Sequence, residues 1–144
     1  MISLSSSINI YRPVKQVFGF ISISENDFQW QYGTLASAQV SEGTTRVGTF
    51  FQSIGHLMGH RIQSTFEVTD FEADRKYGFK SISGPMQSQT LYTFEMDKGS
   101  TRIDITTQAS LINFFQIREN LLEKQMKKQL KENLALLKNI LEAG

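Results

Sequence analysis

The chain has 144 residues, of which 40% are hydrophobic, and its 15 basic and 14 acidic side chains give a formal net charge of +1. This balance shows no basic excess of the kind that marks nucleic-acid binding, and the absence of cysteine excludes disulfides, thiolate chemistry and zinc–sulfur sites. The length favours one domain over residues 1–144. Without a signal-peptide pattern or an apolar run of the roughly 18 residues that span a bilayer, we expect a cytoplasmic protein with no stable membrane insertion.

The first thirty residues predict a strand followed by two short helices. Met1–Ile10 alternates apolar and polar residues, which is typical of a strand with one buried face. Pro13 suits the first turn of a helix, and the residues after it are apolar at helical spacing: Val14, Val17, Phe18 and Ile21. Ser24 is a suitable N-cap for a second short helix that ends near Trp30.

The remainder predicts six strands and one long helix. From Tyr32 to Leu111 the sequence is strand-like and interrupted by turn residues such as "SEG", "LMG" and "DKGS". Beyond Asn113, a plausible cap, no glycine or proline occurs until Gly144, which predicts a helix over residues 114–143. This order indicates an α+β fold, an antiparallel meander with one helix covering a face.

The only two histidines lie in the stretch "SIGHLMGHRI" and fit a hairpin better than a metal pair. A three-residue loop Leu57-Met58-Gly59 would pair His56 with His60 and Phe50 with Phe66, so that apolar residues face each other. Zinc usually takes at least three protein ligands, and no third ligand is apparent near the two histidines. We therefore expect no metal site.

The other hairpins can be closed in the same way, with apolar residues kept on one face. A four-residue loop over residues 71–74 pairs Val68 with Tyr77. The Gly84-Pro85 loop pairs Tyr77 with Tyr92 and Phe79 with Thr90, and a four-residue loop over 97–100 pairs Tyr92 with Ile105.

Polar side chains run through the middle of this inner face, which predicts a cavity. Beside the aromatic residues lies a row of small or polar ones: Gln52, Ser64, Ser81 and Ser88. Unpaired buried polar groups cost about 1–3 kcal/mol each, so water or a ligand inside would satisfy them. The alternative is that these groups bond to backbone in a tight core.

The first turns of the long helix add a possible anchor. By helical angle Arg118 lies in the apolar stripe, so we hypothesise that it points into the cavity and binds a carboxylate. The alternative is an arginine that extends to solvent. The candidate ligand-binding residues are Trp30, Phe50, Gln52, Ser64, Phe66, Tyr77, Phe79, Ser81, Ser88, Thr90, Tyr92, Thr107, Arg118 and Leu122.

Several segments carry a family resemblance: "INIYRPVKQVFGFIS", "ENDFQW", "RVGTFF", "FEVTDFEADRKYGFKSISGP", "YTFEMDKGSTRIDI" and "LKNILE". Across nearly the whole chain the sequence resembles the SRPBCC superfamily of START lipid-transfer domains and birch-pollen-type allergens, and most of all its small polyketide cyclase/dehydrase-like branch. The resemblance implies a helix-grip fold, in which a curved seven-stranded antiparallel sheet wraps around the long C-terminal helix and encloses a hydrophobic cavity. No catalytic motif common to all members carries over to this chain.

Three functions stay open on the sequence. The leading one is binding of a small apolar or amphipathic molecule, as a carrier or sensor that needs no cofactor, because aromatic walls with a few polar groups are typical of such pockets. The second is a cyclase- or dehydratase-like enzyme, although the centre of the inner face holds no acid or histidine that would act as an acid–base group. The third is a protein-interaction module.

Overall fold

The computed structural model describes residues 1–111 and 118–143. Its first part contains β1 (Ile2–Ile10), α1 (Val14–Ile21), a 3-10 turn (Ser24–Asn26), α2 (Asp27–Trp30) and β2 (Thr34–Gln39). The strands that follow are β3 (Phe50–Leu57), β4 (His60–Glu72), β5 (Lys76–Ser83), β6 (Met86–Asp97) and β7 (Ser100–Leu111), and the chain closes with α3 (Glu119–Ala143). The predicted order of a strand, two short helices, six strands and a long helix is confirmed.

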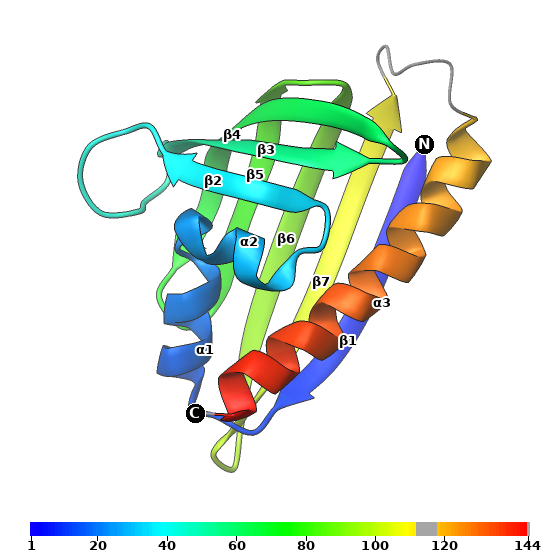
Figure 1. Cartoon of the computed structure of the whole chain (residues 1–144). Coiled ribbons are helices and arrows are strands. Elements are labelled where there is room, and N and C mark those ends of the chain that lie inside the picture. The colour runs from blue at the N-terminus through cyan, green and yellow to red at the C-terminus, as the bar shows by residue number, and fades with distance from the viewer. Residues whose placement is uncertain (112–117, 144) are drawn as a thin grey trace.

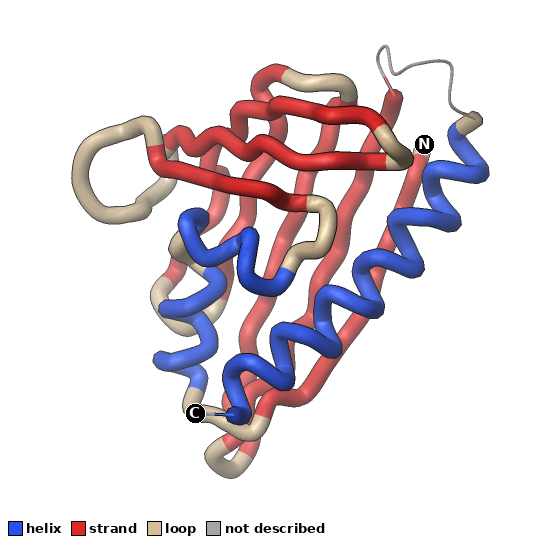
Figure 2. Tube along the Cα trace, in the orientation of Figure 1, coloured by secondary structure: helices blue, strands red, loops and turns tan. Residues whose placement is uncertain are grey.

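The seven strands form one antiparallel sheet in the order β1-β7-β6-β5-β4-β3-β2. Figure 1 shows α3 crossing the open side of the sheet beside β1. On the same side, α2 lies against β2, and α1 contacts β6 and β7. Figure 2 shows the strands bending around these helices, so that the sheet is concave toward them. No helix in residues 1–111 and 118–143 is long and apolar enough to cross a bilayer.

The predicted registers of β5, β6 and β7 are confirmed. Tyr77 pairs with Tyr92 and Phe79 with Thr90, and Tyr92 pairs with Ile105 on its other side. The β6–β7 loop is shorter than predicted, because the ladder continues to Asp97 and Ser100.

The predicted register between β3 and β4 is wrong by one residue. The turn contains only Met58 and Gly59, both with positive φ (49° and 82°), as a type I′ turn requires. Leu57 therefore pairs with His60 and Phe51 with Phe66. Since side chains alternate along a strand, this shift reverses the two faces of β3.

The β4–β5 pairing also differs from the prediction. The turn covers residues 73–75 instead of the predicted 71–74, so Glu72 pairs with Lys76, and an irregularity between Val68 and Asp70 then brings Val68 opposite Phe79. A bulge adds a residue to one strand and changes the pairing without ending the ladder. The displacement is two residues, so Val68 and Tyr77 keep the buried face that was predicted for them.

The buried residues fall into two clusters. The larger cluster joins α1, α2 and the C-terminal half of α3 to the sheet, and its members include Phe18, Trp30 and Leu137. The smaller joins the start of β1 and of α3 to the ends of β3 and β7, and its members are Ile2, Leu4, Leu57, Ala109 and Leu122. The cavity described below is lined by residues of both clusters, so it lies between them.

Candidate ligand cavity

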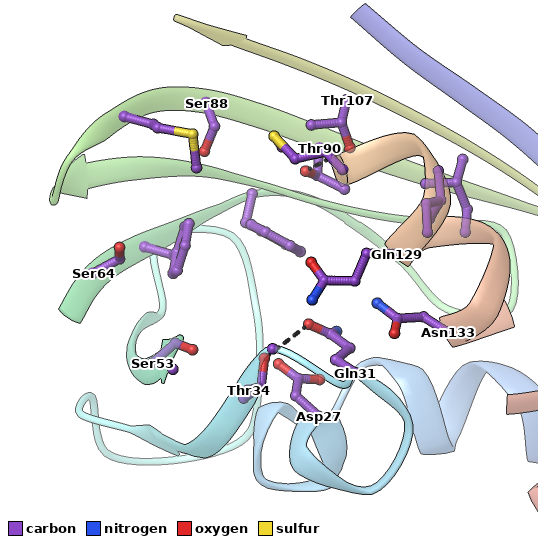
Figure 3. Close-up of a pocket in the computed structure, with 18 of the residues that line it drawn as sticks. Asp27, Gln31, Thr34, Ser53, Ser64, Ser88, Thr90, Thr107, Gln129 and Asn133 are labelled. Atoms are coloured by element: carbon purple, nitrogen blue, oxygen red, sulfur yellow. Dashed lines mark hydrogen bonds between the residues drawn. The ribbon is translucent and has the colours of Figure 1, made fainter. Parts of the chain in front are cut away.

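A cavity of about 250 Å³ lies between the concave face of the sheet, the α2–β2 segment and α3. Figure 3 shows hydroxyl groups of the sheet on one side and polar residues of α2, β2 and α3 on the other. The lining residues are Leu4, Asp27, Trp30, Gln31, Gly33, Thr34, Phe51, Ser53, Gly55, Ile62, Ser64, Phe66, Phe79, Met86, Ser88, Thr90, Tyr92, Ile105, Thr107, Met126, Gln129, Leu130 and Asn133.

Aromatic rings from neighbouring strands form one wall of this cavity. Phe51 stacks on Phe66 with ring centroids 5.1 Å apart, and Phe79 meets both rings edge-on at 5.3 Å. Trp30 of α2 meets Tyr92 edge-on at 6.5 Å. Because each ring is held by others, the wall presents a preorganised apolar surface.

The hydroxyl groups of the sheet divide between two roles. The Ser81 hydroxyl donates to the Met86 carbonyl at 3.0 Å and accepts from the Ser88 amide at 2.9 Å, so backbone satisfies it. Thr90 and Thr107 lie in the cavity wall and hydrogen-bond to each other at 3.1 Å. For Ser81, the hydroxyl therefore bonds to backbone, which was the alternative to a cavity that the sequence left open.

The structure brings together much of the predicted set at this cavity. The predicted residues that line it are Trp30, Ser64, Phe66, Phe79, Ser88, Thr90, Tyr92 and Thr107. Two others, Tyr77 and Leu122, are buried in the core outside the cavity lining. Tyr77 stacks on Tyr92 at 5.9 Å and so supports the wall from behind.

The remaining predicted residues lie away from the cavity. Phe50 and Gln52 face outward because of the corrected β3 register, and Phe51 and Ser53 line the cavity in their place. Arg118 is exposed and precedes α3, where its carbonyl accepts the Leu122 amide at 3.1 Å. The expectation that Arg118 faces the cavity does not hold; Asn113 and residues 114–117 of the expected helix lie outside the described residues.

The sequence reading missed a polar end of the cavity, which α2, β2 and α3 form together. Asp27 and Gln31 are one helical turn apart, and so are Gln129 and Asn133 (Figure 3). The Thr34 hydroxyl donates to Gln31 Oε1 at 3.2 Å. In the sequence, this polar end could have been predicted from Gln129 and Asn133, which are four residues apart and lie beside the apolar residues Met126 and Leu130.

Among the described residues, the inner face of the sheet has no acidic one, but Asp27 of α2 brings one to the cavity. Burial raises the pKa of its carboxyl above the ordinary value of 3.8, and the negative charge of Glu25 raises it further. Burial also raises the pKa values of Tyr77 and Tyr92, and the charge of Asp27 adds to both effects. Asp27 therefore keeps its proton to a higher pH than an ordinary carboxyl does, and the protonated form donates a hydrogen bond.

Two glycines hold the α2–β2 link against β3 at the cavity. A Cβ on Gly55 would lie 2.1 Å from the Gly33 carbonyl oxygen, and a Cβ on Gly33 would lie 2.9 Å from Gln129 Nε2. The same Gly33 carbonyl accepts the His56 amide at 2.7 Å. Only residues without a side chain permit this approach.

The histidines do not contribute to the cavity. His56 is exposed and lies opposite Arg61, and His60 closes the same hairpin opposite Leu57. Over residues 1–111 and 118–143, no group of three or more histidine, aspartate or glutamate side chains is placed to hold a metal ion.

The sequence matches one family model, described as polyketide cyclase / dehydrase and lipid transport, over residues 1–142. The chain therefore belongs to this family, which lies within the SRPBCC superfamily. No curated protein matches the sequence.

Solved structures share the fold along its whole length. TTHA0849 from Thermus thermophilus is 16% identical, with a TM-score of 0.83 over 98% of this chain and 97% of its own. A START superfamily protein from Mycobacterium smegmatis is 10% identical, with a TM-score of 0.84 over 99% of both chains. The Zhui aromatase/cyclase from a Streptomyces species is 11% identical, with a TM-score of 0.77 over 97% of this chain and 93% of its own. At these identities the likeness concerns the fold alone, and it confirms the helix-grip fold.

Proposed function

We propose that this protein binds a small apolar or amphipathic molecule in the cavity between the sheet and α3. The observation that carries the proposal is the composition of the cavity wall, in which rings such as Phe51, Phe66 and Tyr92 surround a few hydroxyl and amide groups. Apolar surface that leaves water contributes about 25 cal/mol per Å², while a small number of polar groups orient the ligand. The family description, which includes lipid transport, agrees with such a role.

A second candidate function is catalysis on a ligand of this kind. The inner face of the sheet lacks an acid, but α2 supplies Asp27 to the same cavity lining as the hydroxyl-bearing Tyr92. A carboxyl whose pKa is raised can act as a general acid toward a carbonyl or hydroxyl oxygen. This residue supports a cyclase- or dehydratase-like activity, which the family description also names.

Native mass spectrometry of the protein purified from cells tests the binding function. We expect a bound species that organic extraction releases as a small apolar or amphipathic molecule. Incubation of the loaded protein then separates the two candidates, because an enzyme converts its ligand and a carrier returns it unchanged. A protein that carries nothing from cells and takes up no apolar probe contradicts both functions.

A further inference from the structure

The described lining of the cavity contains an acidic side chain but no basic one. Among the described residues that line it, Asp27 is the only aspartate or glutamate, and no lysine, arginine or histidine is present. Arg118, which the sequence placed there, is exposed outside the cavity. A carboxylate ligand would therefore meet an acidic group without a cationic partner, and two carboxyl groups that share a site cannot both ionise without a penalty.

The amide side chains at the same end of the cavity disfavour a positively charged ligand. Asn133 Oδ1 accepts the Tyr32 amide at 3.0 Å, and Gln31 Oε1 accepts the Thr34 hydroxyl at 3.2 Å. With these oxygens engaged, the NH₂ groups of Gln31 and Asn133 remain as donors, which suit an oxygen atom and repel an ammonium group. Figure 3 shows both residues on the same side of the cavity as Asp27.

We propose, on the basis of the binding function above, that the cavity selects an apolar molecule whose polar end is an uncharged oxygen group, such as a hydroxyl, phenol or ketone, held by Asp27 and its amide neighbours. A neutral oxygen accepts hydrogen bonds from these donors without adding charge to a buried site. The matching carboxylate would bring in a charge that no cationic side chain of the described lining balances, and the matching amine would meet the NH₂ groups of Gln31 and Asn133. The aromatic wall holds the rest of the molecule.

Four matched fluorescent probes test this selection: naphthalene, 2-naphthylmethanol, 2-naphthoate and 2-naphthylmethylamine. Their dissociation constants are measured at pH 7 with the whole chain. We expect the alcohol to bind about tenfold more tightly than either naphthalene or 2-naphthoate, which corresponds to one hydrogen bond gained or one unfavourable charge avoided.

Two substitutions separate hydrogen bonding by Asp27 from a purely structural role. Asp27→Asn keeps a hydrogen-bond donor at this position, so the alcohol should stay within about threefold of wild type and should still bind more tightly than 2-naphthoate. Asp27→Leu should bring the alcohol down to the affinity of naphthalene. Glu132→Gln, a change of an exposed acid on α3, is the control and should alter none of the four constants.

The outcomes distinguish this inference from the function on which it rests. Naphthalene binding with no gain for the alcohol, or with tightest binding of the carboxylate or the amine, overturns the inference and leaves the binding function standing. An equal loss for all four probes in Asp27→Leu also overturns it, because a structural role affects every ligand alike. Binding of none of the four overturns both.

Discussion

Gly55 on β3 and Gly33 before β2 are in such close contact that a Cβ on Gly55 would lie 2.1 Å from the Gly33 carbonyl oxygen. Both residues line the cavity, and the Gly33 carbonyl is already bonded to the His56 amide. The position of the α2–β2 link, and with it the positions of Asp27 and Gln31, therefore depends on the absence of one side chain.

Replacement of Gly55 by alanine should destabilise the protein by roughly 1–3 kcal/mol, because the new methyl group meets backbone that must move. Gly19→Ala is the matched control. An added Cβ at Gly19 has nothing within 4 Å, and Gly19 lies inside α1, where alanine is favoured by about 1 kcal/mol. Urea unfolding of both variants gives the comparison, and equal stability of Gly55→Ala and wild type would show that the contact is absent.

The two neighbouring phenylalanines of β3 provide a test of its register. Phe51 is 3% exposed and packs against Phe66 and Phe79, whereas Phe50 is 38% exposed on the other face. Phe51→Ala should cost about 3–5 kcal/mol and Phe50→Ala less than about 1 kcal/mol. The reverse order in chemical denaturation would support the register with Phe50 inside.

The pKa of Asp27 predicts a specific pH dependence of stability. Below the ordinary value of 3.8 the carboxyl is protonated in both folded and unfolded chains, so it has no effect. As the pH rises above that value the unfolded chain ionises first, because its pKa is the lower one, and wild type loses stability. The loss is at most about 1.4 kcal/mol per pH unit over this window.

Asp27→Asn cannot ionise, so its free energy of unfolding should exceed that of wild type by an amount that grows from pH 4 toward neutrality. Unfolding by urea at a series of pH values measures this difference. A difference that shrinks as the pH rises would mean that the folded protein stabilises the charged form of Asp27.

Arg118 offers a test of where the polar end of the ligand lies. Because Arg118 is exposed at the start of α3, Arg118→Met should leave the dissociation constants of 2-naphthoate and 2-naphthylmethanol unchanged. Equilibrium fluorescence titration checks this. Selective weakening of the carboxylate alone would return Arg118 to the role of an anchor and move the polar end away from Asp27.

The hairpins that the sequence predicted correctly are those with regular ladders. Between β6 and β7 the alternation of apolar residues is uninterrupted, so Tyr92 and Ile105 could be paired from their pattern alone. The β3–β4 register was missed because the turn places Met58, which is not a glycine, at positive φ. Residue types favoured a three-residue loop there, and this choice moved Phe50 to the wrong face.

The polar end of the cavity was not predicted because it depends on tertiary structure. Asp27 belongs to a helix of four residues, too short for its pattern to show which side is buried. Gln129 and Asn133 border the apolar stripe of α3, and they approach Gln31 only because Gly33 lets the α2–β2 link lie against the helix. Such encounters between distant segments leave no local periodic pattern.

If the space between the sheet and α3 is the ligand site, a side chain that fills this space should prevent binding. Ser88 lines the cavity, whereas its neighbour Gln87 is exposed on the opposite face of β6. We predict that Ser88→Phe abolishes the binding of 2-naphthylmethanol while the variant stays folded by circular dichroism, and that Gln87→Phe binds like wild type. Wild-type affinity in a folded Ser88→Phe variant would contradict the claim and place the ligand elsewhere on the protein.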